Sequence, residues 1–370
     1  MIKKIICLIS ICFSFVGMAY AENYAVLISA GKAYTDYTAL NSEYWYDLYL
    51  TYEYLLGYEN YDSTNVYVFY GDGVDYNSDI PRFQPSFNNW GTITDYDNSY
   101  YTMYNVLSSL DNIITDEDNL LFYWVVGHGE IDLISLNPDT YYAYIENRND
   151  RVSKSRVKDL VDCINHYNKR KIIWMTCHSG CMGEASNNLN NEKTVLITSV
   201  PVEELSAAMK DIFQSTYHSA FNYAMYCIVT GHYPHDVLDV EVPSHFRTVM
   251  GYLTRTSNYV ERYYDDSILS LYEIKDLVGR FRSVFPYISY WDYNPQLYGS
   301  DLAEKIFFWE EKTIEDITLS RSESYWLDQL ELKNVSIANN TNVDLDIEVD
   351  DHFSIESNIL IPVGSSLLVK

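Results

Sequence analysis

Residues 120–129 read LLFYWVVGHG, and residues 171–180 read KIIWMTCHSG. Each segment is an apolar run that stops at small residues beside a reactive side chain, His128 in the first segment and Cys177 in the second. Short continuous apolar runs are typical of strands that are buried on both faces of a parallel sheet. Ligands of such sheets bind at the carboxyl ends of the strands. The two segments therefore predict neighbouring strands that bring an imidazole and a thiol to one crevice.

Alternating strand and helix patterns extend outward from these two segments. Further strands are predicted at residues 24–29, 65–70 and 194–200. Helices are predicted at residues 41–58, 101–114, 153–164 and 215–230, the third of them capped by Ser153 or Ser155. Residues 74–99 and 130–150 are predicted to be long loops. Because strands alternate with helices, we expect an α/β fold with a mainly parallel sheet and helices on both faces.

The pattern changes after about residue 312. The apolar residues between Val343 and Val349 alternate with acidic residues, which is typical of a strand with one solvent-exposed face. Shorter strands are predicted at residues 354–359 and 365–369, and no tandem repeat is evident. We therefore expect residues 313–370 to form a small C-terminal all-β module.

The N-terminus has the pattern of a secretory signal. Lys3 and Lys4 precede an apolar stretch from Ile5 to Val16, and Ala19-Tyr20-Ala21 supplies a cleavage site. The apolar stretch is shorter than a membrane-spanning helix requires. We therefore expect a signal peptide over residues 1–21 and a mature chain without an integral membrane segment. Such a protein is secreted, periplasmic or bound to the cell surface, and the short Lys-Lys signal is typical of bacteria.

Composition and charge restrict the class of partner. The chain has 370 residues, of which 47% are hydrophobic, so it can bury a large core. Its formal net charge of −27 argues against nucleic acid or an anionic membrane surface as the main partner, because phosphate binding requires clustered Lys and Arg. The charge is that of a self-repelling extracellular protein, although attraction to basic substrates is an alternative.

Cysteines and histidines do not predict a metal site. After removal of the signal, the chain retains Cys163, Cys177, Cys181 and Cys227, which is too few for a disulfide-built scaffold. If Cys177 stays a free thiol, at most one disulfide can form among the others. The pair Cys177 and Cys181 lacks a second ligand pair at zinc-like spacing, and we interpret His232–Asp236 as a surface loop.

The chemistry predicted for the crevice is nucleophilic attack by a cysteine. His128 can take the proton of Cys177, the thiolate can attack a carbonyl carbon, and His128 can then protonate the leaving amine. Gly129 allows a close backbone approach, and its N–H together with that of Cys177 would form an oxyanion hole. Taken singly, His128 could be a strand-end histidine and Cys177 a buried packing residue. Their joint position at strand ends favours catalysis.

At these residues the chain resembles the legumain (asparaginyl endopeptidase) family of cysteine peptidases and, more distantly, the caspases and gingipains. The resemblance covers residues 22 to about 300, and it rests on segments in the family's order: residues 24–31, 126–129, 175–182, 196–204 and 294–298. It implies a caspase-like fold for residues 22–312 and peptide-bond hydrolysis. It also implies that His128 and Cys177 are the catalytic pair.

The resemblance extends less well to the substrate pocket. The family's acidic residue after the nucleophile is His178 here, and Thr38 lies near the place of an arginine that binds asparagine in the family. Ser199 belongs to a segment that borders the substrate in such peptidases. We therefore expect substrate contacts at His178, Ser199 and Thr38, without cleavage after asparagine. His178 could line the specificity pocket, assist the thiolate electrostatically, or lie in a surface loop.

The sequence as a whole predicts a secreted cysteine endopeptidase that acts on protein or peptide substrates through a Cys-His dyad and a thioester acyl-enzyme. This mechanism needs no cofactor, although Asp-rich loops such as Gly71–Asp79 leave calcium as an alternative. Two other functions stay open: a transpeptidase or ligase, in which an amine intercepts the thioester, and a catalytically inactive surface-binding protein. Legumains have a helical C-terminal extension, so a β-module suggests surface attachment, sorting or substrate docking.

Overall fold

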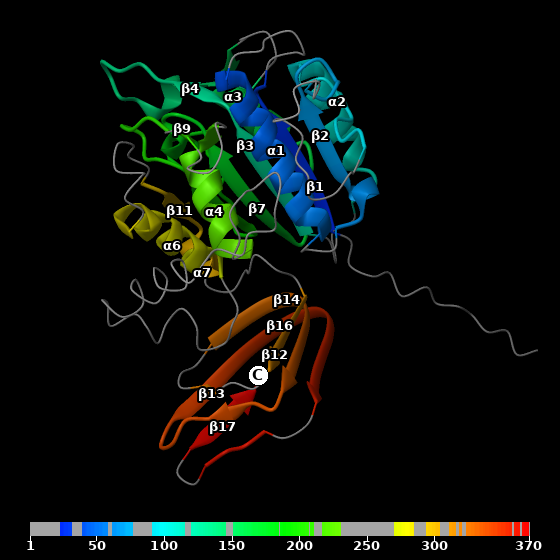
Figure 1. Ribbon diagram of the computed structural model, residues 1–370, viewed down its shortest axis with the longest axis vertical. Helices are drawn as coiled ribbons and strands as arrows, with labels where there is room; N and C mark the ends of the chain where they lie inside the picture. Colours follow the sequence, from blue (N-terminus) through cyan, green and yellow to red (C-terminus); the bar gives the residue numbers. More distant parts are fainter. Residues whose placement is uncertain are drawn as a thin grey trace, which may run out of the picture.

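A six-stranded sheet forms the centre of a mixed α/β fold (Figure 1). Its strands, in spatial order, are β11 (Gln296–Tyr298), β8 (Thr194–Thr198), β7 (Lys169–Met175), β3 (Leu120–Val126), β1 (Asn23–Ser29) and β2 (Val66–Tyr70). All neighbours are parallel except β11, which is antiparallel to β8. The prediction of a mainly parallel sheet is therefore confirmed.

The structure is a computed structural model. It describes residues 23–31, 39–57, 61–76, 91–114, 120–145, 151–184, 186–206, 208–210, 217–230, 270–284, 294–303, 311–315, 318–319, 323–356, 359–362 and 365–369. The predicted signal at residues 1–21 lies outside these ranges. In the described part of the chain, no helix has both the length and the apolar character needed to cross a bilayer.

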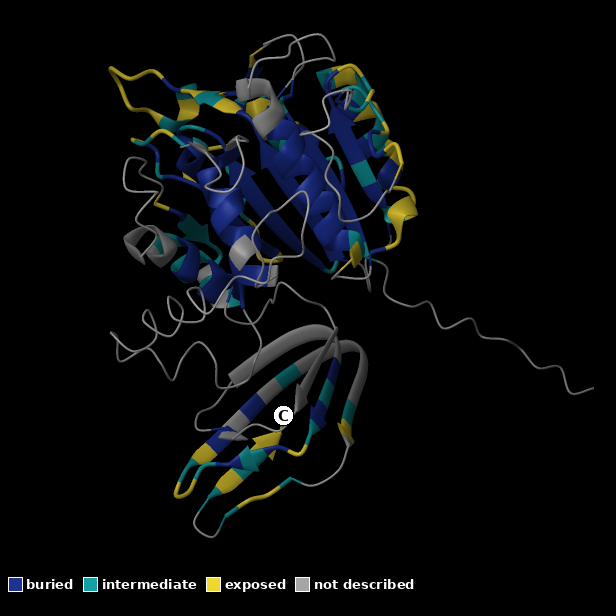
Figure 2. Cartoon of the chain, viewed as in Figure 1, coloured by how far each residue is buried: buried dark blue, intermediate teal, exposed yellow. Residues whose placement is uncertain are grey.

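Helices cover both faces of this sheet, as expected. One face packs against α1 (Ala39–Gly57), α4 (Ala220–Thr230) and α6 (Leu271–Val284), and the other against α2 (Tyr100–Leu110) and α3 (Lys154–Val161). Figure 2 shows that the strands between these layers are almost entirely buried. Each fully buried large apolar side chain contributes about 1.5–3 kcal/mol, so burial on two faces holds the strands in place.

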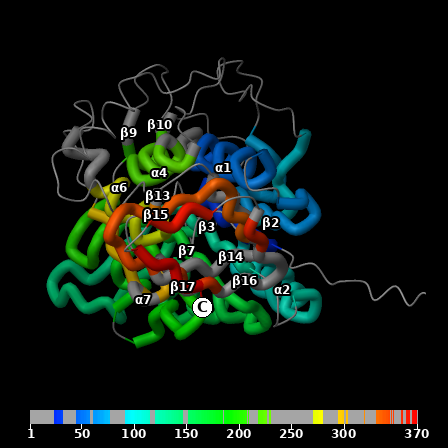
Figure 3. The backbone as a smooth tube through the Cα atoms, turned by 90° about the horizontal axis from the view of Figure 1, so that it is seen from below, coloured from blue at the N-terminus to red at the C-terminus, as the bar shows by residue number. Residues whose placement is uncertain are grey.

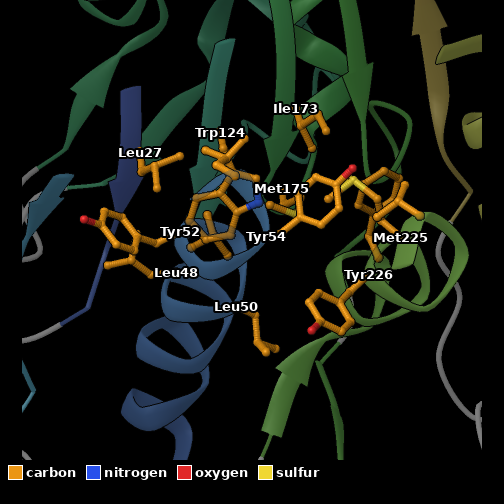
Figure 4. Close-up of a cluster of buried hydrophobic side chains, with 14 of the residues drawn as sticks. Leu27, Leu48, Leu50, Tyr52, Tyr54, Trp124, Ile173, Met175, Met225 and Tyr226 are labelled. Atoms are coloured by element: carbon orange, nitrogen blue, oxygen red, sulfur yellow. The ribbon is translucent and has the colours of Figure 1, made fainter. Parts of the chain in front are cut away.

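Strand β3 shows why an apolar run forms the middle of this sheet. Its side chains alternate between the two cores, so that Trp124 faces α1 and α4 while Tyr123 and Val125 face α2 and α3. The indole Nε1 of Trp124 donates to Asn222 Oδ1 of α4 at 3.1 Å, which gives this buried polar group a partner. Figure 4 shows Trp124 in the core between α1 and α4.

Several predicted element boundaries were wrong. The predicted loop at 130–150 includes strand β5 (Tyr142–Tyr144), which forms a small antiparallel sheet with β4 (His128–Glu130) and β6 (Val152–Ser153) at the two ends of this segment. The helix predicted at 215–230 begins only at Ala220, because β10 (Tyr217–Ser219) first pairs antiparallel with β9 (Ala208–Lys210). Three-residue strands are too short to show a readable period.

Two helix ends also differ from or refine the prediction. Helix α2 ends at Leu110 rather than at residue 114, because a turn follows in which Asn112 N donates to Ser109 O. Of the two candidate serines, Ser153 is the N-cap of α3, where its hydroxyl accepts from Arg156 N. A further short helix among the described residues is α7 (Ser300–Ala303).

The C-terminal strands form two small sheets of parallel neighbours. One has the order β12 (Glu311–Glu315), β14 (Glu323–Lys333), β16 (Asn342–Glu356) and β17 (Ser366–Val369), and the other pairs β13 (Thr318–Leu319) with β15 (Ser336–Ile337). Because spatial order follows chain order and every pair is parallel, the chain winds as a coil between two sheets (Figure 3).

The coil has its own apolar interior. Buried residues from successive turns form one cluster: Leu319, Leu330, Leu332, Val335, Ile337, Val343 and Leu345. Val343 and Leu345 of β16 are fully buried, as predicted for the apolar face of this strand, whereas the side chains of the acidic residues between them lie outside the described part of the structure. Each turn of the coil pairs in parallel with the next turn: Glu311 of β12 lies beside Gln329 of β14, and Asn342 of β16 lies beside Ser366 of β17.

Candidate active site

The parallel register of β3 and β7 brings the two predicted reactive residues to one level of the sheet. Val126 lies beside Met175, and Gly127 N donates to Met175 O at 3.1 Å. His128 is two residues beyond Val126, and Cys177 is two residues beyond Met175. Both side chains therefore start from the carboxyl ends of adjacent strands, which is where this class of sheet binds its ligands.

Gly129 brings the two backbones into direct contact. A Cβ atom added to Gly129 would lie 2.0 Å from the carbonyl oxygen of Cys177 and 3.0 Å from a ring carbon of Tyr141. No side chain fits at this distance. The absence of a side chain at residue 129 therefore allows the start of β4 to lie directly on the backbone of Cys177.

His128 is the first residue of β4, opposite Tyr144 of β5, and part of the residue is exposed to solvent while its imidazole packs against Tyr44. The hydroxyl of Tyr44, in the N-terminal part of α1, lies 3.0 Å from Nε2 and 3.3 Å from Nδ1 of His128. The two rings meet edge to face, with centroids 5.5 Å apart. Desolvation of the imidazole lowers the pKa of His128 below its usual value. The ring is therefore neutral, and able to accept a proton, at neutral pH.

Cys177 is a half-buried thiol that forms no disulfide. Its Sγ lies 3.9 Å from the backbone carbonyl of Ser206, in the loop that follows β8. Cys163 and Cys181 are also free, whereas the side chain of Cys227 is outside the described part of the structure. Burial raises the pKa of Cys181 to about 12, so this neighbour stays a protonated thiol, in line with its predicted packing role.

A buried polar layer supports the residue that precedes the thiol. The hydroxyls of Thr176 and Tyr141 lie 2.7 Å apart, and Trp174 Nε1 donates to both of them, at 3.1 and 3.2 Å. All three side chains are fully buried, and burial raises the pKa of Tyr141. Because every member of the layer has a partner, it fixes the end of β7 from which Cys177 projects.

His178 is buried, so the alternative of a surface loop histidine was wrong. Its backbone is left-handed, with φ of 57°, and it begins a short 3-10 helix over Ser179–Met182. The backbone N of His178 donates to Glu204 O at 2.9 Å, and Nδ1 lies 2.6 Å from Val202 O. This geometry requires the Nδ1–H tautomer. His178, which directly follows Cys177, therefore holds the loop after β8 beside the thiol.

Ser199 lies at the end of β8 and is fully buried. Its hydroxyl donates to Thr176 O at 3.4 Å and lies 3.1 Å from Ser206 Oγ and 3.3 Å from Ser179 Oγ. Ser199 therefore connects the strand that bears Cys177 with the loop that contacts its sulfur. Thr38, the third predicted substrate contact, lies outside the described residues.

A second buried histidine contacts α1 close to Tyr44. His218 Nδ1 is 2.9 Å from Asp47 Oδ1, both side chains are almost fully buried, and Ser219 N donates to the other carboxylate oxygen at 2.6 Å. Asp47 lies three residues after Tyr44 on α1. The pair therefore fixes the part of α1 from which Tyr44 contacts His128.

Within the described ranges, no group of three or more His, Cys, Asp or Glu side chains is arranged to hold a metal ion. The segment His232–Asp236 and part of the Asp-rich loop at residues 71–79 lie outside those ranges.

A comparison with models of known protein families finds none that matches this chain, and a comparison with curated proteins finds no significant match.

Proposed function

We propose that the chain is a cysteine endopeptidase in which Cys177 is the nucleophile and His128 the general acid and base. The observation that carries this proposal is the β3–β7 register, which starts an imidazole and a thiol outside any disulfide from the same level of adjacent strands. The neutral state of His128 at neutral pH suits a base that takes the thiol proton. The bond from sulfur to the carbonyl carbon then forms, and the amine leaves with the proton held by His128.

The finer fold assignment belongs to the same proposal. A sheet whose order is β2-β1-β3-β7-β8-β11, with a single antiparallel strand at its far edge, is what a caspase-like domain over residues 22–312 would require. We assign Gly129 N–H and Cys177 N–H to the oxyanion, because the contact between these two residues leaves both backbones beside the thiol. The substrate class is a polypeptide, and no cofactor takes part.

Labelling with a peptidyl acyloxymethyl ketone library tests this function. These reagents form a thioether with an activated thiol, and mass spectrometry locates the modified cysteine. We expect labelling at Cys177 alone, none in a Cys177→Ala chain, and a rate at least about 100-fold lower in His128→Ala. Cys181 is a built-in control for unspecific alkylation. A folded chain that no probe labels would refute the proposal in favour of a binding protein.

We also propose that the protein is secreted and that the coil of residues 313–370 attaches it to the cell surface or docks its substrate. The support is the separate apolar interior of the coil, which shares no residue with the two cores of the α/β part. Deletion of residues 313–370 should leave Cys177 labelling intact and change the cell fraction or the substrate range. Unchanged localisation and substrate range would contradict this role.

A further inference from the structure

Among the described residues, Tyr44 is the one whose side chain forms a hydrogen bond with the imidazole of His128. Its hydroxyl reaches both ring nitrogens. A hydroxyl can donate one hydrogen bond and accept others, so it can partner the ring in either ionisation state. It can donate to an unprotonated nitrogen of the neutral ring, and it can accept from the N–H of an imidazolium.

Two separate attachments hold Tyr44 in this position. Its backbone carbonyl accepts from Ser29 Oγ at 3.2 Å, and Ser29 lies at the end of β1, beside Val126 of β3. One turn further along α1, the buried carboxylate of Asp47 accepts from His218 and from Ser219 N. This part of α1 is therefore fixed to β1, the neighbour of β3, and to β10, and neither attachment uses the Tyr44 hydroxyl.

We propose that Tyr44 is a positioning residue of this peptidase, which orients the His128 ring and accepts a hydrogen bond from the imidazolium formed when Cys177 gives up its proton. This role rests on the proposed function. Hydrogen bonds to charged groups are about twice as strong as neutral ones, so the hydroxyl stabilises the protonated ring more than the neutral ring. Loss of the hydroxyl should therefore shift the titration of His128 to lower pH.

The test uses Tyr44→Phe, with Tyr70→Phe as the matched control. Tyr70 is a fully buried tyrosine of β2 that packs on Trp45, the neighbour of Tyr44 on α1. Its hydroxyl has no hydrogen-bond partner among the described residues. Each variant loses one hydroxyl and keeps its ring. The backbone contact of residue 44 with Ser29 is unaffected by the substitution, so α1 should keep its position.

Two readouts separate the inference from the proposed function. In the Cys177→Ala chain, NMR of 13Cε1-labelled histidine follows His128 directly, with the signal assigned by His128→Ala. We expect its titration to move to lower pH with Tyr44→Phe and to stay in place with Tyr70→Phe. In the chain that retains Cys177, we expect about a tenfold fall in the maximal labelling rate with Tyr44→Phe, at unchanged probe affinity.

The possible results lead to different conclusions. An unchanged His128 titration in Tyr44→Phe overturns the inference, whether or not the probes label Cys177. A shifted titration in a chain that no probe labels supports the positioning role and refutes the peptidase function. A loss of labelling in Tyr44→Phe that is accompanied by loss of probe affinity, with no titration shift, would assign Tyr44 to substrate binding and also overturn the inference.

Discussion

Replacement of Gly129 by alanine probes the closest contact at the proposed site. The added Cβ would lie 2.0 Å from the Cys177 carbonyl oxygen, whereas ordinary van der Waals contact begins at 3.4 Å. The two backbones must therefore separate by the difference, about 1.4 Å, because neither partner is a flexible side chain that could move aside. Gly129→Ala thus displaces β4, and His128 with it, relative to the thiol.

The magnitude of the effect follows from this displacement. A misplacement of about 1 Å in a catalytic arrangement lowers the rate about 100-fold. Overpacking at a tight position costs about 1–3 kcal/mol of folding free energy, which a domain of this size can tolerate without unfolding. We therefore expect Gly129→Ala to fold with a reduced melting temperature and to react at Cys177 about 100-fold more slowly.

The assay measures the second-order rate of Cys177 labelling by the best acyloxymethyl ketone, beside thermal unfolding. Gly57→Ala is the matched control, because a Cβ at this last residue of α1 meets no described atom within 4 Å. It should label at the parental rate. If Gly129→Ala folds and also labels at the parental rate, then the contact between residue 129 and Cys177 does not hold the reactive pair together, and the reasoning fails.

Three further outcomes are expected. Iodoacetamide should modify native Cys177 well before Cys181, whose thiol is fully buried with a pKa of about 12, and peptide mass spectrometry measures the order; equal rates would contradict the burial. Asp47→Ala removes the buried carboxylate that contacts His218 and Ser219 N, and it should lower the free energy of unfolding in urea by about 3–5 kcal/mol. A loss below about 1 kcal/mol would show that the pair is not structural. Desolvation lowers the pKa of His128, so its neutral form persists as the pH falls. The rate of Cys177 labelling should therefore reach half its maximum below about pH 6.5. A midpoint above that value would contradict the assignment of His128 as the base.

The five parallel strands of the central sheet were predictable because strands buried on both faces are apolar in composition, whereas the short antiparallel strand β11 was not predicted. An apolar run such as Leu120–Val126 needs no periodicity to be identified, and its end shows where a ligand can bind. The small sheet of β4, β5 and β6 could not be predicted in this way, because strands of two or three residues show no period. The C-terminal coil repeats in its strand pairing and not in residue identity, so no sequence repeat indicated it.

The candidate site divides along the same line. His128 and Cys177 were predicted from local sequence, because each lies two residues beyond a buried strand. Tyr44 was not predicted, since it is separated from His128 by 84 positions and is one of 37 tyrosines, several of them on α1. Composition cannot single out one tyrosine, because only the packing of α1 on the sheet decides which hydroxyl reaches the imidazole.

The position of His178 indicates how specificity and chemistry are connected in this site. Its side chain and backbone fasten the loop after β8 through Val202 O and Glu204 O, and the same loop brings Ser206 O to the sulfur of Cys177. The thiol itself is fixed from the other side, by the buried layer under Thr176. A change at residue 178 therefore acts first on the loop, and through the loop on the surroundings of the sulfur. If the proposed peptidase function holds, a change at residue 178 should alter substrate preference more than it alters the reactive pair, because the hydrogen bonds of His178 run to the loop.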